Sequence, residues 1–205
     1  MIERIGIVGG GQLGRMETLA AKPLGFEVIV IDPTKISTAH GDIPSSPAAQ
    51  VGAEQIIGNL DDPEALQELA KRIGPDAPIT WEIEHINTDE LVRLEDEGYN
   101  IQPSPRSLAI IKDKLTQKQH FEARGLPIAD FQTLDDEADF DSVCARWVNF
   151  ITKSRTGGYD GRGNQVQTGQ AWHEVLDHFY ELYGPDAQLY AERTVKLQKE
   201  LSVIV

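Results

Sequence analysis

The sequence predicts an α/β protein whose first domain is built on a parallel sheet and whose second domain is an α+β unit. In the first hundred residues, short apolar runs alternate with helical stretches, which is typical of parallel α/β units. A glycine-rich turn joins the first apolar run to the first helical stretch. The pattern changes beyond Pro103-Ser104-Pro105, so we expect two domains, residues 1–102 and 103–205.

Local signals mark where the expected elements begin and end. Pro23 and Gly25 end the first helix, because proline cannot continue the hydrogen-bond ladder and glycine readily adopts the left-handed exit conformation. Asp62 followed by Pro63 is typical of a helix start, and Asp113 is the expected N-cap of a later helix. In the first domain we expect strands at 5–8, 27–32, 55–57 and 79–84, and helices at 12–21, from 63 to about 72 and from 87 to 98. In the second domain we expect helices at 114–124 and 171–183, and strands near 131 and at 150–153, 165–167, 188–192 and 200–205.

The composition argues against several classes of protein. The 205 residues carry a formal net charge of −14, which repels nucleic-acid backbones and anionic lipid, and no basic patch offsets it. No apolar run approaches the roughly 20 residues that span a bilayer. Cys144 is the single cysteine, and the five histidines lack metal-ligand spacing. We therefore expect a cytoplasmic protein with no nucleic-acid or membrane partner.

The segment Gly9-Gly10-Gly11-Gln12-Leu13-Gly14 fits the pattern G-x-G-x-x-G between an expected strand and an expected helix. Backbone N–H groups and the positive end of the helix dipole can bind an anion at such a turn. With Asp32 at the end of the next strand, the pattern is typical of a Rossmann-like dinucleotide site with Asp32 on the ribose hydroxyls. The motif alone leaves two interpretations open, a dinucleotide site and a tight turn that binds nothing.

A stronger signal is the segment from Lys153 to Asn164, which holds four glycines and three cations between two expected strands. The glycines allow the backbone to close over phosphate oxygens, and Lys153 can neutralise them as a point charge. The alternative is a surface hairpin without a ligand. The concentration of glycines and cations favours a phosphate-binding loop.

Five blocks of the sequence together resemble the N5-carboxyaminoimidazole ribonucleotide synthetases, an ATP-grasp family of purine biosynthesis. They occur in the family's order and extend over nearly all of the 205 residues. The blocks are Gly9-Gly10-Gly11-Gln12-Leu13-Gly14-Arg15-Met16, Glu82-Ile83-Glu84-His85, Asp113-Lys114-Leu115-Thr116-Gln117-Lys118, Lys153 to Gly163, and Glu200-Leu201-Ser202-Val203-Ile204-Val205. The resemblance implies a Rossmann-like first domain without a nicotinamide cofactor, followed by an incomplete ATP-grasp domain that continues beyond Val205.

The resemblance also implies roles for individual residues. In the first domain it places aminoimidazole ribonucleotide against Gly11, Gln12, Leu13 and Glu84. Lys114 stands where bacterial members often have arginine, so a phosphate-facing cation is kept while bidentate geometry is lost. The residues implied to bind ATP are Lys114, Lys153, Gly158, Tyr159, Asp160, Gly161, Arg162, Gly163, Glu192, Val195 and Glu200, and those implied to be catalytic are Lys153, Tyr159, Asp160 and Arg162.

The implied reaction uses ATP, Mg²⁺ and bicarbonate to carboxylate the exocyclic amine of aminoimidazole ribonucleotide through carboxyphosphate. In the family the Mg²⁺ ligands come after Val205, so we expect the 205 residues alone to be inactive. The resemblance separately implies that the full-length protein is a homodimer. Three alternatives stay open. They are an NAD-dependent oxidoreductase that uses the glycine turn and Asp32, an ATP-grasp ligase with another acceptor, and a truncated module that only binds a partner.

Overall fold

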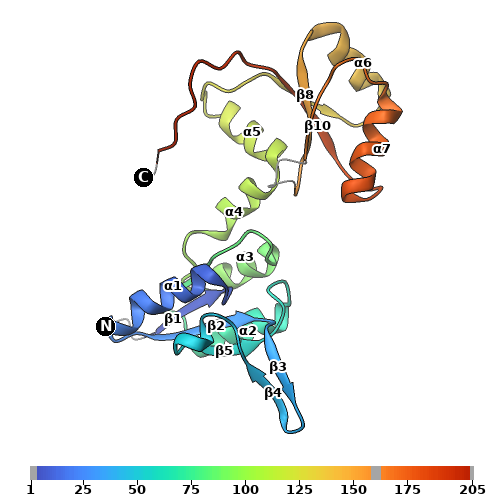
Figure 1. Ribbon diagram of the computed structural model, residues 1–205. Helices are drawn as coiled ribbons and strands as arrows, with labels where there is room; N and C mark the ends of the chain where they lie inside the picture. The colour runs from blue at the N-terminus through green and yellow to red at the C-terminus, as the bar shows by residue number, and fades with distance from the viewer. Residues whose placement is uncertain (1–3, 158–162, 204–205) are drawn as a thin grey trace. The chain divides into compact units, whose positions relative to one another are not determined.

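The computed structural model describes residues 4–157 and 163–203. The chain divides into two compact units, Met1–Ala109 and Ile110–Val205. Figure 1 shows each unit with its own sheet and helices. The division falls within helix α4 (Pro105–Lys112), shortly after the domain boundary predicted at residues 102 and 103, which stays a prediction.

The first unit is built on a parallel sheet. Its four strands lie in the order β5-β2-β1-β6, and every pairing is parallel, as the alternation of apolar runs and helices predicts. Parallel strands need a long connection between them, and helices supply it between β1 and β2 and between β5 and β6. The strands are β1 (Arg4–Val8), β2 (Glu27–Asp32), β5 (Glu54–Ile57) and β6 (Ile79–Trp81), and the helices are α1 (Gln12–Ala21), α2 (Pro63–Ile73) and α3 (Thr88–Asp96), with 3-10 turns at Lys22–Leu24 and Ala49–Val51.

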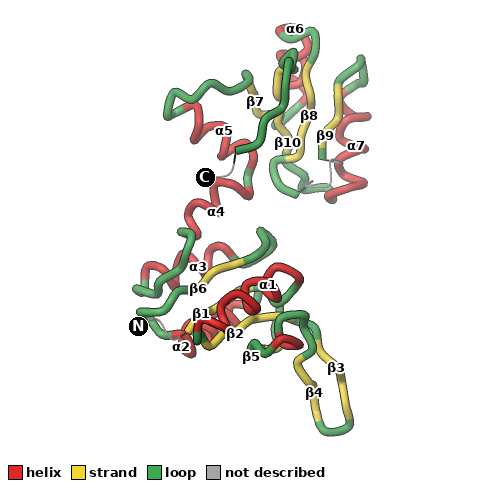
Figure 2. Tube along the Cα trace, turned by 60° about the vertical axis from the view of Figure 1, so that its left-hand side comes forward, coloured by secondary structure: helices red, strands yellow, loops and turns green. Residues whose placement is uncertain are grey.

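Helices cover both faces of this sheet, and Figure 2 shows the layers. On one face, Leu66 and Leu69 of α2 and Leu91 of α3 pack against Val8 and Ile31 of the central strands. On the other face, Ile7, Val28 and Val30 pack with Ala21 at the end of α1. The central strands are therefore apolar on both sides, which is typical of a parallel sheet.

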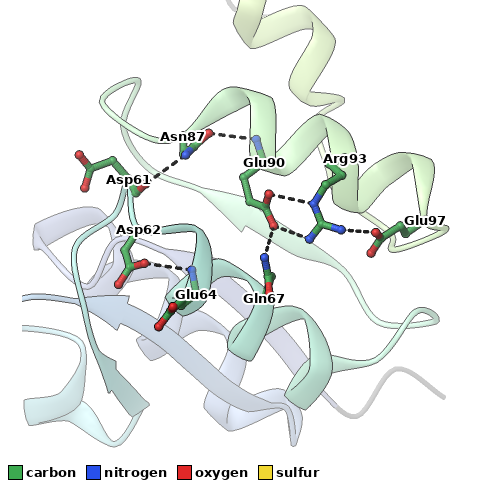
Figure 3. A network of polar contacts seen from close by, with 8 residues as sticks. All are labelled: Asp61, Asp62, Glu64, Gln67, Asn87, Glu90, Arg93 and Glu97. Atoms are coloured by element: carbon green, nitrogen blue, oxygen red, sulfur yellow. Dashed lines mark hydrogen bonds and ion pairs between the residues drawn. The ribbon is translucent and has the colours of Figure 1, made fainter.

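A polar network joins α2 to α3 at the surface of the first unit, and Figure 3 shows it from close by. Gln67 of α2 donates from Nε2 to Oε1 of Glu90 at 3.0 Å. The same carboxylate accepts from Nε of Arg93 at 2.9 Å, and Arg93 also pairs with Glu97. Asn87 caps α3 by accepting from the amide of Glu90 at 3.0 Å. These bonds hold the two helices in register over the apolar layer beneath them.

Two carboxylates of the chain hold the turn between β1 and α1. Asp32 accepts from the amide of Gly10 at 3.1 Å, and Glu82 accepts from the amide of Gly11 at 2.9 Å and also from that of Gly14. Strand β6 stops at Trp81, earlier than predicted, although the amide of Glu82 still donates to the carbonyl oxygen of Val8 at 3.3 Å. The side chain of Glu82 points at this turn. The carboxylate of Glu82 thus occupies the place at the N-terminus of α1 where an external anion binds in other proteins.

The glycines of this turn are required by packing within the chain. Gly9 has φ of +120°, and a Cβ there would lie 2.3 Å from Cγ of Glu82. A Cβ on Gly14 would lie 2.4 Å from the carbonyl oxygen of Gly9. The pattern G-x-G-x-x-G is therefore explained by the close approach of strand, helix and Glu82.

The second unit contains an antiparallel sheet with strand order β7-β10-β8-β9. One face of this sheet, which carries Leu189 and Ala191 of β10, packs against helices α6 and α7. The helices contribute Phe140 and Val143 of α6 and Phe179 of α7. Asp113 caps α5 as predicted and accepts from the amides of Leu115 and Thr116. The elements are α5 (Lys114–Glu122), β7 (Phe131–Leu134), α6 (Glu137–Arg146), β8 (Phe150–Ser154), β9 (Asn164–Val166), α7 (Trp172–Tyr183) and β10 (Leu189–Arg193).

Three features differ from the sequence-based expectation. The strand expected at 200–205 is wrong for residues 200–203, which form no strand because the described part of the chain gives them no pairing partner. The hairpin of β3 (Lys35–Thr38) and β4 (Gly41–Pro44) and helix α6 were not expected. Within the described residues, no helix is long and apolar enough to cross a membrane.

We predict that Glu82→Gln loosens the turn between β1 and α1. Glutamine can accept from one of the two amides but presents an NH₂ group to the other, and a lost hydrogen bond to a charged group costs about 1.5–3 kcal/mol. Hydrogen exchange of the peptide covering residues 9–16, measured by mass spectrometry, should accelerate by roughly tenfold or more.

Glu27→Gln is the matched control, since Glu27 forms an exposed ion pair with Arg4 at 3.1 Å. Such pairs contribute only about 0–1 kcal/mol, so exchange at residues 9–16 should stay unchanged. Equal protection of this peptide in Glu82→Gln and in the unsubstituted chain would show that the carboxylate does not hold the turn.

Candidate functional site

The residues predicted to bind a ribonucleotide lie at the carboxyl edge of the parallel sheet. Gly11 lies directly before α1, and Gln12 and Leu13 form its exposed first turn, with 50% of Leu13 accessible. Glu84 follows β6, the neighbour of β1 in the sheet, and its Oε1 lies 3.2 Å from Nε2 of His85. The structure brings these four residues to the edge where ligands of open α/β sheets bind.

Asp32, the residue that the dinucleotide interpretation places on a ribose, holds the backbone of its own chain. Only 7% of the residue is accessible, and its two carboxylate oxygens accept from the amides of Gly10 and Thr34 at 3.1 and 2.8 Å. The structure thus gives Asp32 a structural role, and its role as a ribose ligand stays a prediction of the dinucleotide interpretation.

In the second unit, one face of the antiparallel sheet carries charged residues. Because side chains alternate along a strand, Tyr190 and Glu192 of β10 point away from the face that Leu189 and Ala191 pack against α6 and α7. Lys153 of β8 lies on the same charged face and donates from Nζ to Oε2 of Glu192 at 3.1 Å. The structure thus brings together two of the residues predicted to bind ATP.

A third side chain, Lys118 of α5, completes this group. Its Nζ lies 3.0 Å from Oε1 of Glu192, so each carboxylate oxygen contacts a different lysine. We call Lys118, Lys153 and Glu192 the lysine–glutamate cluster. Burial acts to raise the pKa of Glu192, but the two lysines outweigh it and hold the pKa below its ordinary value.

The base of the glycine-rich loop is fixed by α5. The ammonium of Lys114 donates to the carbonyl oxygens of Ser154 and Gly157, and burial, followed by the charge of Lys153, lowers the pKa of Lys114. Asp113 pairs with the guanidinium of Arg155, with Nε of Arg155 3.2 Å from Oδ1. The start of α5 is therefore tied to the strand that leads into the loop.

Gly163 closes the loop, because its carbonyl oxygen accepts from the amide of Ser154 at 3.1 Å. Val195 is exposed and follows β10 closely, while Glu200 is exposed and lies outside any strand. The roles predicted for these residues stay predictions. The other residues predicted for this loop, Gly158, Tyr159, Asp160, Gly161 and Arg162, lie outside the described residues.

Sequence reasoning did not assign ligand-site roles to four residues that the structure places in or beside these sites. Glu82, Lys118 and Arg155 belong to the blocks that carry the family resemblance, and Asp113 was assigned only a capping role. Lys118 lies one helical turn from Lys114, and this spacing could have indicated a second cation on the same face of the helix. Among the described residues, no group of three or more His, Cys, Asp or Glu side chains could hold a metal ion.

Comparison with known families assigns both units. Residues 2–112 match the family "Ribonucleotide synthetase preATP-grasp domain", and residues 119–205 match the family "ATP-grasp domain". The first match covers more than half of the chain, and the second covers the second unit from residue 119 onward.

Individual proteins agree with this assignment. N5-carboxyaminoimidazole ribonucleotide synthase of Staphylococcus haemolyticus is 38% identical over 205 residues, which are 99% of this chain and 50% of the relative. The structure of N5-carboxyaminoimidazole synthetase from Staphylococcus aureus complexed with ADP has a TM-score of 0.79 at 29% identity, covering 96% of this chain and 48% of that one.

A third similar protein is the Aspergillus clavatus N5-carboxyaminoimidazole synthase, solved in complex with ADP and 5-aminoimidazole ribonucleotide. It has a TM-score of 0.74 at 30% identity, covering 96% of this chain and 47% of that one. The chain therefore spans about half the length of these relatives. From its parallel first unit, its charged antiparallel second unit and these matches, the chain belongs to the ATP-grasp ribonucleotide synthetases and is a homologue of N5-carboxyaminoimidazole ribonucleotide synthetase.

Proposed function

We propose that this chain is part of a ligase that carboxylates the exocyclic amine of 5-aminoimidazole ribonucleotide in purine biosynthesis. In the proposed reaction, an oxygen of bicarbonate takes the γ-phosphoryl group of ATP to give carboxyphosphate and ADP. The amine nitrogen then forms a bond to the carboxyl carbon, and phosphate leaves. Since the chain spans about half of its relatives, the proposal concerns the full-length gene product.

One observation carries the proposal. The A. clavatus structure, which is in complex with ADP and 5-aminoimidazole ribonucleotide, matches 96% of this chain and hence both units. The residues proposed to bind the two ligands are Gln12, Leu13 and Glu84 in the first unit and Lys153 and Glu192 in the second. Fold and residues together support an ATP-dependent ligase that takes this ribonucleotide.

The chain's own contribution to the reaction is electrostatic. Lys153 and Lys118 supply two positive charges against the single negative charge of Glu192, so the lysine–glutamate cluster attracts anions. Preorganised cations of this kind stabilise the charge that develops on a transferring phosphoryl group. In the first unit, the carboxylate of Glu84 can accept hydrogen bonds from ribose hydroxyls of the acceptor.

Mg²⁺ belongs to the predicted cofactors, since it neutralises nucleotide phosphates in ATP-dependent ligases. The described residues contain no group of three or more side chains able to hold a metal ion, so they do not fit a complete site. The expectation that its ligands follow Val205 stays a prediction.

The NAD-dependent alternative has less support. A dinucleotide pyrophosphate would have to displace the carboxylate of Glu82 from the amides of Gly11 and Gly14, and Asp32 is engaged with backbone amides. The alternative also leaves the lysine–glutamate cluster without a role. An ATP-grasp ligase with another acceptor would share that cluster, and the acceptor must be tested directly.

We expect ADP release by the full-length gene product, with ATP, Mg²⁺ and bicarbonate, to depend strongly on 5-aminoimidazole ribonucleotide. The physical reason is that transfer of the carboxyl group to the acceptor amine discharges carboxyphosphate, so that without the acceptor turnover stalls with carboxyphosphate and ADP bound. A coupled assay of ADP with and without the ribonucleotide makes the measurement. ADP release indifferent to it would point to another acceptor, and binding of NAD without use of ATP would favour the dinucleotide alternative.

Lys153→Met should lower the turnover number at least about a hundredfold, because removing a single preorganised electrostatic contact typically costs two to three orders of magnitude. Lys71→Met is the control, since Lys71 is exposed on α2 of the first unit, and its turnover should match that of the unsubstituted enzyme. Unchanged turnover in Lys153→Met, with the fold intact by circular dichroism, would exclude Lys153 from the reaction.

Glu84→Gln should raise the KM for 5-aminoimidazole ribonucleotide by roughly tenfold or more, because hydrogen bonds to a charged acceptor contribute about 1.5–3 kcal/mol. The KM for ATP should change little, since Glu84 belongs to the first unit and the lysine–glutamate cluster to the second. Steady-state kinetics with each substrate varied in turn makes the comparison. Glu97→Gln, at an exposed position that follows α3, is the control, and a Glu84 variant that kinetically resembles it argues against the proposed site.

A further inference from the structure

The lysine–glutamate cluster contains one more cation than Glu192 needs for charge balance. Lys118 contacts Oε1 at 3.0 Å and Lys153 contacts Oε2 at 3.1 Å, while the hydroxyl of Tyr190 lies 3.5 Å from Oε2. All three members are largely shielded, with 16% of the Glu192 side chain, 20% of Lys118 and 21% of Lys153 accessible. Leaving a shielded carboxylate without any cation costs free energy, so at least one lysine must stay in contact with Glu192.

Lys118 is held in place more firmly than a lysine on a free helix. Asp113 caps α5 through the amides of Leu115 and Thr116 and pairs with Arg155, which follows β8. Lys114 lies one turn before Lys118 and donates to the carbonyl oxygens of Ser154 and Gly157. Because residues four apart share a face of a helix, these contacts turn the side of α5 that carries Lys118 toward the sheet.

The two lysines therefore have different roles when a phosphate group binds. Lys153 stands at the end of β8, next to the glycine-rich segment, and can turn from Glu192 to a phosphate oxygen. If it were the only partner of Glu192, that movement would leave a shielded carboxylate without a cation. Lys118 removes this cost, because it stays on Oε1 while Oε2 becomes available to the nucleotide.

We propose that Lys118 is a positioning residue for nucleotide binding, which holds Oε1 of Glu192 and thereby frees Lys153 for the phosphates. The proposal rests on the proposed function, since it assumes that the second unit binds an adenine nucleotide. The lowered pKa of Glu192, to which Lys118 and Lys153 contribute against burial, agrees with a carboxylate that stays ionised in this position.

The test is a double-substitution cycle with ADP as the probe, in which isothermal titration calorimetry follows binding to the full-length gene product. Lys118→Met should weaken ADP binding by about tenfold, within the range of coupling found for contacting charged residues. Lys118→Arg should restore most of the affinity, because arginine keeps the charge and the reach. In a Glu192→Gln background, Lys118→Met should change the affinity by less than about twofold, since the partner charge is gone.

Thermal unfolding of each variant shows whether it is folded, and Lys118→Gln replaces Lys118→Met in the cycle if the methionine variant does not fold. Lys71→Met again serves as the control and should bind ADP like the unsubstituted protein. Unchanged ADP affinity in the Lys118 variants, or equal losses with and without Glu192, overturns the role of Lys118 and leaves the proposed function standing. Failure of the unsubstituted protein to bind ADP overturns the proposed function and this inference with it.

Discussion

The carboxylate of Glu82 is the constraint on which the first unit's site depends. It joins the end of β6 to the turn after β1, and the strand order β5-β2-β1-β6 makes those two strands neighbours. It accepts from amides at the start of α1 and so fixes the first turn of that helix, where Gln12 and Leu13 are exposed. Glu84, two residues after Glu82, lies at the same edge. The glycine turn is thereby saturated by the chain's own carboxylate, which explains how a Rossmann-like pattern can occur without a dinucleotide.

The second unit uses a carboxylate in a similar way, with cations in place of amides. Glu192 takes one lysine on each oxygen, and the excess positive charge faces the side of the sheet that α6 and α7 leave uncovered. An anionic phosphate is attracted to such a face, whereas a neutral ligand gains little from it. The ion pair of Asp113 with Arg155 and the bonds of Lys114 to the loop's carbonyl oxygens keep α5 beside this face. Helix α5, strand β8 and the described residues next to the glycine-rich segment therefore form one connected group.

Elements with a clear apolar period were predictable, and elements without one were not. The strands β1 and β2 and helix α2 have buried faces, and Asp62 and Asp113 cap their helices as their positions predict. The hairpin β3–β4 escaped prediction because all its residues are exposed, so no alternation of apolar and polar side chains marks it. Helix α6 buries only Phe140 and Val143, too few for a visible stripe. Residues 200–203 carry a strand-like pattern, but a strand exists only where another strand completes its hydrogen bonds.

The sequence by itself determined the parallel α/β character of the first unit, the helix starts and the blocks that resemble an ATP-grasp family, because these depend on neighbours within a few residues. Tertiary structure alone decided that Glu82 fills the glycine turn, that Asp32 accepts from the amide of Gly10, and that Lys118 shares Glu192 with Lys153. Each of these contacts joins residues far apart in the chain, and which of them meet depends on strand order and helix placement. Local periodicity carries no information about that order, so the residue types were visible in the sequence while their partners were not.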